Sequence, residues 1–130
     1  MRAKQISVFA ENRPGRLLDM LQALKGADVS IRALSIADSA DFGIVRMIFS
    51  DTAAAELALR RAGFTVMTND VLAVEVPDHP GGLVDAIVAP LTVAGLNIEY
   101  VYAFADRPAE HALVVLKTND IVAAERVLGL

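Results

Sequence analysis

Two short loops carry residue types suited to binding a small ligand that has both a positive and a negative charge. Each loop has a polar residue close before a Pro-Gly pair, and each leads into a segment that begins with leucine. Asn12 in the first loop or Asp78 in the second could accept hydrogen bonds from an ammonium group. Arg13 or Arg16 could contact a carboxylate, because a guanidinium can hold one bidentately. The pattern therefore favours ligand binding.

The backbone of these loops is also suited to a carboxylate. Gly15, Gly81 and Gly82 have no side chain that would block a ligand from approaching. If a helix follows each loop, its first N–H groups are unpaired and its N-terminus carries a partial positive charge. A structural role is equally open: Asn12 and Asp78 could only cap helices, and Pro-Gly could only turn the chain.

Other kinds of site have little support. His79 and His111 are the only histidines, and they lack the spacing of a metal-binding pair. The absence of cysteine excludes disulfides, thiol catalysis and cysteine metal sites. The sequence contains no nucleophile elbow, phosphate-binding loop or dinucleotide-binding glycine motif. We therefore expect no enzyme activity, no cofactor and no metal.

The composition is typical of a small globular protein. Of 130 residues, 55% are hydrophobic and 22% are charged, which argues against disorder. The net charge of −4 disfavours binding to nucleic acid. Residues 83–96, the longest candidate for a membrane span, are too few and contain Asp85 and Pro90. Because neither a signal peptide nor cysteine is present, we expect a cytoplasmic protein without a membrane partner.

An internal repeat indicates which elements position the two loops. Three blocks recur in the same order, at offsets of 66, 67 and 68 residues. This indicates duplication of a unit of about 65 residues. The matching blocks are 11–19 with 77–85, 27–31 with 94–98, and 42–51 with 110–119.

Each unit is predicted to begin with a strand, a helix, two strands and a second helix. One face of the first helix, which Gly26 ends, is marked by Leu17, Leu18, Leu21 and Leu24. The predicted elements are strands 6–10, 29–36, 44–49 and 64–67 with helices 17–24 and 53–62 in the first unit, then strands 71–76, 97–104 and 111–117 with helices 82–94 and 121–128 in the second.

The second unit has no counterpart of the strand at 64–67. Residues 68–70 could close a hairpin between this strand and the one at 71–76. We hypothesise that the strand at 64–67 bridges the two units or is donated to the second. Without it, a first strand would have an open edge.

Pro90 is a second irregularity, because it lies inside a predicted helix where it cannot donate a hydrogen bond. The repeat gains one residue near the same place. A kink or bulge would explain both observations, and a helix that breaks and restarts is the alternative.

With these elements the sequence resembles tandem ACT domains. The resemblance implies an α+β fold of two ferredoxin-like βαββαβ units in an antiparallel sheet with helices on one face, the second unit lacking its own last strand. The units would be residues 1–68 and 69–130. The residues that carry the resemblance are 12–17 and 78–83, with the helix-to-strand segments 26–31 and 94–98.

The resemblance implies a regulatory protein that binds an amino acid or a similar small molecule. Its output would pass through a partner, such as a regulated enzyme or regulator, or through oligomeric state. A homodimer is expected, because the apolar content is high and one edge strand is incomplete. Ser30 and Asn97 follow the first helix of each unit, and we expect them to line the same cleft as the loops. The expected ligand-binding residues are Asn12, Arg13, Pro14, Gly15, Arg16, Leu17, Ser30, Asp78, His79, Gly81, Gly82, Leu83 and Asn97.

Two other functions remain open at this point. A structural or interaction subunit with a vestigial ligand site is the main alternative. An RNA-binding module is the third, because RNA-recognition domains share the βαββαβ order, but the acidic charge disfavours it. Tyr100, Tyr102 and Phe104 share one strand face, where packing is favoured over ligand contact.

Overall fold

The computed structural model describes residues 1–39, 41–104 and 111–130. Its strands form one six-stranded antiparallel sheet in the order β2-β3-β1-β4-β6-β5, and the α+β fold expected from the sequence is confirmed. The chain divides into two compact units, Lys4–Asn69 and a second made of Met1–Ala3 with Asp70–Leu130. The elements are β1 (Arg2–Glu11), α1 (Arg16–Gly26), β2 (Ile31–Ser39), β3 (Phe42–Phe49), α2 (Thr52–Arg61), β4 (Thr65–Pro77), η1 (Val84–Val88), α3 (Ala89–Val93), β5 (Ile98–Phe104), β6 (His111–Thr118) and α4 (Ile121–Leu128).

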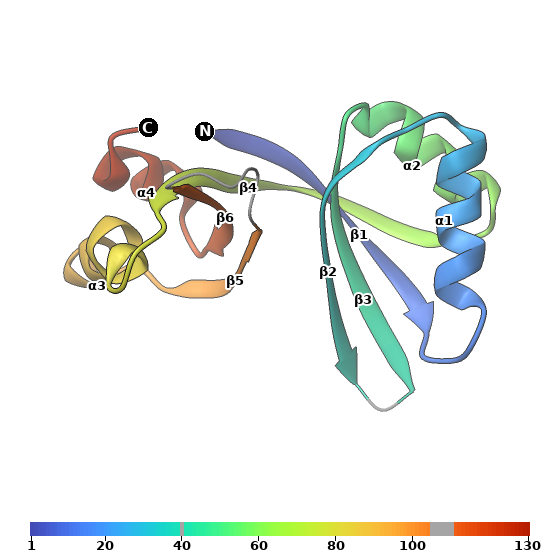
Figure 1. Cartoon of the computed structure of the whole chain (residues 1–130), viewed down its shortest axis with the longest axis horizontal. Helices are drawn as coiled ribbons and strands as arrows, with labels where there is room; N and C mark the ends of the chain where they lie inside the picture. The colour runs from blue at the N-terminus through green and yellow to red at the C-terminus, as the bar shows by residue number, and fades with distance from the viewer. Residues whose placement is uncertain (40, 105–110) are drawn as a thin grey trace. The chain divides into compact units, whose positions relative to one another are not determined.

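The first unit, Lys4–Asn69, packs α1 and α2 against one face of its strands (Figure 1). Alternate residues of β1 point to that face, and Ile6 and Val8 lie across from Met47 and Val45 of β3. All four side chains are buried, so the helices and the strands share one apolar core. The core consists of Ile6, Val8, Ala10, Met20, Leu24, Val45, Met47, Phe49, Ala55, Leu59, Phe64 and Val66.

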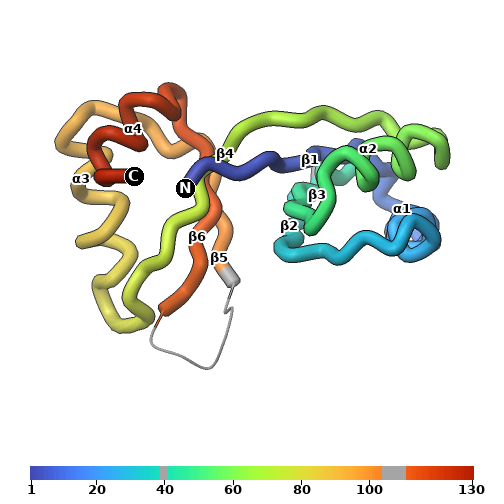
Figure 2. Tube along the Cα trace, turned by 90° about the horizontal axis from the view of Figure 1, so that it is seen from above, coloured from blue at the N-terminus to red at the C-terminus, as the bar shows by residue number. Residues whose placement is uncertain are grey.

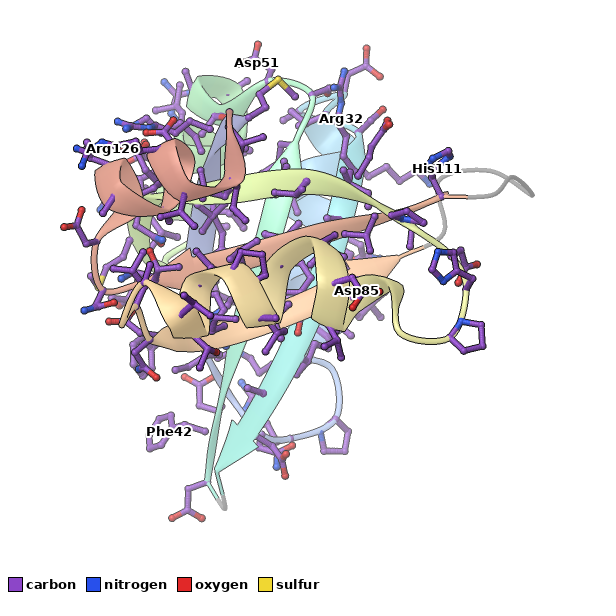
Figure 3. The ribbon with its side chains drawn as sticks, turned by 90° about the vertical axis from the view of Figure 1, so that its left-hand side faces the viewer. Arg32, Phe42, Asp51, Asp85, His111 and Arg126 are labelled. Carbon is purple, nitrogen blue, oxygen red and sulfur yellow. The ribbon has the colours of Figure 1, made fainter. Side chains whose placement is uncertain are left out.

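The second unit has the same arrangement of its own elements. β6 pairs antiparallel with β4 on one side and with β5 on the other. Figure 3 shows α3 and α4 on the same face of these strands. The core between them consists of Leu72, Val76, Ile87, Leu91, Val114, Leu116 and Ala124.

β4 differs from the sequence prediction, because it runs without interruption from Thr65 to Pro77. The predicted hairpin at residues 68–70 is therefore wrong. Asn69 and Asp70 are residue types that tolerate the positive φ of a tight hairpin turn, but neither adopts it, and β4 stays beside β1 in the sheet. Among the described residues, Asp28 alone has a positive φ without being glycine. The hypothesised bridging strand exists in this longer form, since β4 passes from the first unit into the second after Asn69.

The place of the missing last strand is taken by the start of β1. The Ala73 amide donates to the Met1 carbonyl at 2.8 Å, and the Met1 ammonium donates to the Ala73 carbonyl at 3.0 Å. Arg2 forms ion pairs with Glu125 and Asp70 of the same unit. Figure 2 shows this N-terminal segment, in blue, beside β4. Met1–Ala3 thus pair with the first strand of the second unit.

The irregularity at Pro90 is a bulge, as one of the two interpretations expected. η1 is a π-helical turn, and α3 follows it directly without a break. A π turn accommodates one residue more than an α turn, which explains the added residue in the repeat. Pro90 is the second residue of α3, directly after the π turn, and the wider turn accommodates a residue that has no N–H to donate.

Gly82 provides a test of the close packing at the start of this helix. A Cβ on Gly82 would lie 2.1 Å from the carbonyl oxygen of Pro77, so the backbone would have to move. We expect Gly82→Ala to lower the free energy of unfolding by about 2–3 kcal/mol in urea denaturation.

Gly26→Ala is the matched control. A Cβ on Gly26 meets no atom within 4 Å, and its φ is not positive. Alanine also favours a helix, so this variant should be as stable as the parent or more stable. If Gly82→Ala were equally harmless, the close contact with Pro77 would be contradicted.

Candidate ligand-binding loops

The first loop, residues 12–15, joins β1 to α1 and is fixed by backbone hydrogen bonds. The Asn12 amide donates to the Asp41 carbonyl at 2.9 Å, which ties the loop to the start of β3. The Arg13 amide donates to the Glu11 carbonyl at 2.9 Å. Gly15 has a φ of 91°, a conformation that favours glycine, and its carbonyl accepts the first bond of α1 from Asp19. The loop therefore has a defined shape.

No side chain of the described residues caps α1 or η1. The other two long helices are capped: Asp51 Oδ1 accepts from the Ala54 amide at 3.1 Å, and Asp120 Oδ1 accepts from the Ala123 amide at 3.0 Å. The capping role considered for Asn12 and Asp78 is thus not adopted. The first amides of α1 lack a side-chain acceptor, so the positive N-terminal end of this helix suits an anion.

Arg16 is held by its neighbours at the start of α1. Its Nε donates to Glu11 Oε2 at 2.5 Å, and its Nη1 lies 3.5 Å from Asp19 Oδ2. Its guanidinium also stacks 4.1 Å from the centre of the Phe64 ring. Arg16 joins β1 to α1 and lies along a cavity of about 150 Å³ that includes Phe9, Phe42 and Phe64. The Arg16 side chain is therefore already bound by Glu11, Asp19 and Phe64 of the same chain.

A second cavity, of about 170 Å³, lies on the other side of the end of β1. Of the residues expected to bind a ligand, Asn12, Arg13 and Leu17 line this cavity, whereas Pro14 and Gly15 do not. Sequence reasoning missed the rest of the lining, because it comes from the adjoining strands. The complete lining is Ala10, Glu11, Asn12, Arg13, Leu17, Ile36, Gly43 and Val45.

The second loop, residues 78–82, repeats the backbone of the first. Gly81 has a φ of 85°, and its carbonyl accepts from the Asp85 amide at 3.0 Å. The Gly82 amide donates to the His79 carbonyl at 3.0 Å. Leu83 follows, with its side chain partly exposed. Figure 3 shows Asp85 at the loop end of this helix.

The side chains of the two loops differ in charge. Arg13 and Arg16 belong to the first loop and the turn after it. The second has Asp78, His79 and Asp85, with glycine at the position equivalent to Arg16. A carboxylate ligand would therefore meet more positive charge at the first loop.

Ser30 and Asn97 lie away from the loops of their own units. The Ser30 amide donates to Ser50 Oγ at 3.1 Å, just after the last residue of β3. Asn12 lies at the opposite end of that strand. The Asn97 amide likewise donates to Asn119 Oδ1 at 2.9 Å, just after the last residue of β6. The second loop follows Pro77, which pairs with His111 at the first residue of β6. Within each unit the structure therefore does not bring this residue and the loop together at one end of the sheet. Ser30 instead lines a cavity of about 370 Å³ at the C-terminal end of α1.

The tyrosines of β5 are half-buried. Tyr100 lies across from Lys117 and Tyr102 across from Val115 on β6. Phe104 is in β5, but its side chain is outside the described part.

Within residues 1–39, 41–104 and 111–130, no cluster of three or more histidine or acidic side chains could hold a metal ion. No helix in these ranges is long and apolar enough to span a membrane.

The Arg16–Glu11 contact predicts a pH dependence. A hydrogen bond from its own backbone amide, and then the bond from Arg16, lower the pKa of Glu11 below its ordinary value of 4.5. Because the pKa is lower in the folded state, the ionised Glu11 stabilises the folded protein at pH values above its ordinary pKa. This stabilisation is lost as the pH falls through the folded-state pKa. We expect Glu11→Gln to be less stable than the parent at pH 7 and to approach it in acid.

Unfolding of both proteins between pH 7 and pH 3, without ligand, measures this difference. The exposed Glu75→Gln on β4 is the matched control. A gap between Glu11→Gln and the parent that stayed constant across this range would exclude the contact as its cause.

Comparison with known proteins supports the fold described above. Residues 1–129 match the family model for an ACT domain pair. A protein from Bacteroides thetaiotaomicron of solved structure is 38% identical, with a TM-score of 0.92 over 99% of this chain and 88% of that one. The ligand-free regulatory subunit of aspartate kinase from Thermus thermophilus is 16% identical, with a TM-score of 0.66 over 97% and 87%. The regulatory subunit from Thermus flavus is 18% identical, with a TM-score of 0.65 over 97% and 88%. No curated protein matched in sequence.

The two aspartate kinase subunits share the fold, and the match over 129 residues shows that the chain belongs to the ACT domain pair family.

Proposed function

We propose that this protein is a regulatory module that binds an amino acid at its first loop. The cavity beside that loop carries the proposal, because it combines charged and apolar groups in one small volume. Glu11, Asn12 and Arg13 line one part, and Leu17, Ile36 and Val45 line another. Membership of the ACT domain pair family supports a regulatory role.

The two charges of an amino acid suit separate groups in the cavity. Arg13 and the open amides of α1 would bind the carboxylate. Asn12 Oδ1 and the Glu11 carboxylate would accept from the ammonium. Arg16 is assigned a positioning role, because Glu11, Asp19 and Phe64 already hold it. The apolar lining favours a ligand with an aliphatic side chain.

Regulation would follow from linkage. A ligand that binds one arrangement of the protein more tightly shifts the population toward it, and a partner or a second copy responds to that shift. We propose a cytoplasmic homodimer whose partner is a regulated enzyme or regulator. An interaction subunit without a ligand remains the alternative, supported by the exposed apolar side chains of α1 and β2.

A thermal-shift screen with the twenty amino acids, followed by calorimetry, tests the proposal. A ligand at 100 times its Kd should stabilise the protein by about 2.7 kcal/mol. We expect Arg13→Gln to weaken the binding of the hit at least about tenfold, because a charge-assisted contact is lost.

Two variants separate the loops. Arg61→Gln, on the exposed end of α2, is the matched control and should bind as the parent does. Asp78→Asn should have no effect if the first loop alone binds, and it should halve the stoichiometry if both loops bind. Lack of binding by the folded parent protein would favour the interaction subunit.

A further inference from the structure

Gly43 lies near the start of β3, which has β2 on one side and β1 on the other (Figure 1). It is buried, and it pairs with Ala10 of β1 and with Asp38 of β2. A glycine weakens a strand, because it has no side chain to pack and loses more conformational freedom on folding than other residues do. A glycine at a buried position between two strands therefore needs a physical reason.

The backbone does not require a glycine at this position. The φ of Gly43 is not positive, and both pairings of β3 keep one register on either side of it, without a bulge. A Cβ added to Gly43 would lie 3.6 Å from the Ala37 carbonyl oxygen and 3.9 Å from that of Ala10, which are ordinary contact distances. The remaining reason for a glycine in a strand is the close approach of a ligand.

Gly43 also lines the cavity beside the first loop. It lies opposite Ala10 on the adjacent strand, and both residues belong to the lining. A Cβ on Gly43 would lie 3.9 Å from Cγ2 of Ile36, which is part of the same lining. A methyl group at this position would therefore occupy space inside the cavity without displacing the protein around it.

The volume of the cavity limits the size of its ligand. It is about 170 Å³, and an apolar cavity of about 150 Å³ holds one benzene molecule. Glu11, Asn12 and Arg13 line the same space, so the charged groups of an amino acid take up part of it. Phenylalanine combines such a ring with its charged groups and exceeds this volume, whereas valine does not. Leu17 and Val45 make the surroundings of the side chain apolar.

We propose that Gly43 determines the ligand specificity of the first loop, and that the ligand is a branched aliphatic amino acid of about the size of valine. Its charged groups would contact Glu11, Asn12 and Arg13, and its side chain would lie against Gly43 and Ala10. The assignment rests on the proposed function, since it concerns the same cavity. It adds the residue that limits the size of the ligand side chain.

Gly43→Ala tests this role, because it reduces the volume of the cavity and leaves the charged groups in place. The contacts of the added Cβ are ordinary, so the midpoint of thermal unfolding should equal or exceed that of the parent. One methyl group in an apolar pocket changes ligand discrimination by about tenfold or more. In calorimetry, the preference for L-valine over L-alanine should therefore fall at least about tenfold in this variant.

Two other variants are the controls. Gly26→Ala is the matched glycine replacement, because its Cβ meets no atom within 4 Å and Gly26 does not line the cavity. It should bind L-valine as the parent does. Arg13→Gln removes the proposed contact to the carboxylate, which both amino acids have. It should weaken both to the same degree and leave their ratio unchanged.

L-isoleucine and L-phenylalanine complete the series of probes. We expect the parent to bind L-valine or L-isoleucine more tightly than L-alanine and L-phenylalanine. Three results would overturn the inference and leave the proposed function in place: tighter binding of L-phenylalanine, an unchanged ratio of valine to alanine binding in Gly43→Ala, or a lower unfolding midpoint of this variant. If the parent binds a different amino acid and none of these four, the inference alone is wrong. If it binds none of the twenty, the proposed function is wrong as well.

Discussion

The fold depends on the pairing of two long strands that serve both units. β4 closes the sheet of the first unit with its early residues and opens the second unit with the rest. β1 does the reverse, because Met1–Ala3 pair with the second unit and the remainder lies in the first. Each unit therefore obtains a four-stranded arrangement from six strands in total, and backbone groups that a separate second unit would leave unpaired have partners.

Duplication has preserved the backbone of the two loops while their side chains have diverged. Gly15 and Gly81 share a positive φ, and the residue four positions later donates to each glycine carbonyl. The position of Arg16 is glycine in the second unit, where a close contact with Pro77 excludes a side chain. In the first unit the arginine instead joins β1 to α1 through Glu11 and Asp19. The same turn thus supports an arginine that links β1 to α1 in one unit and a close backbone contact in the other.

The sequence by itself determined the repeat, the kind and order of the elements other than β4, and an irregularity near Pro90. These follow from local properties: apolar periodicity, glycine and proline positions, and an offset that grows by one residue. The tertiary structure decided the partners. Residues 68–70 have the composition of a turn, but they continue an extended strand that lies beside β1 in the sheet. Ile36, Gly43 and Val45 reach the first-loop cavity only through the pairing of β2 and β3. Strand partners and cavity walls depend on contacts between residues far apart in the chain, which local sequence patterns do not specify.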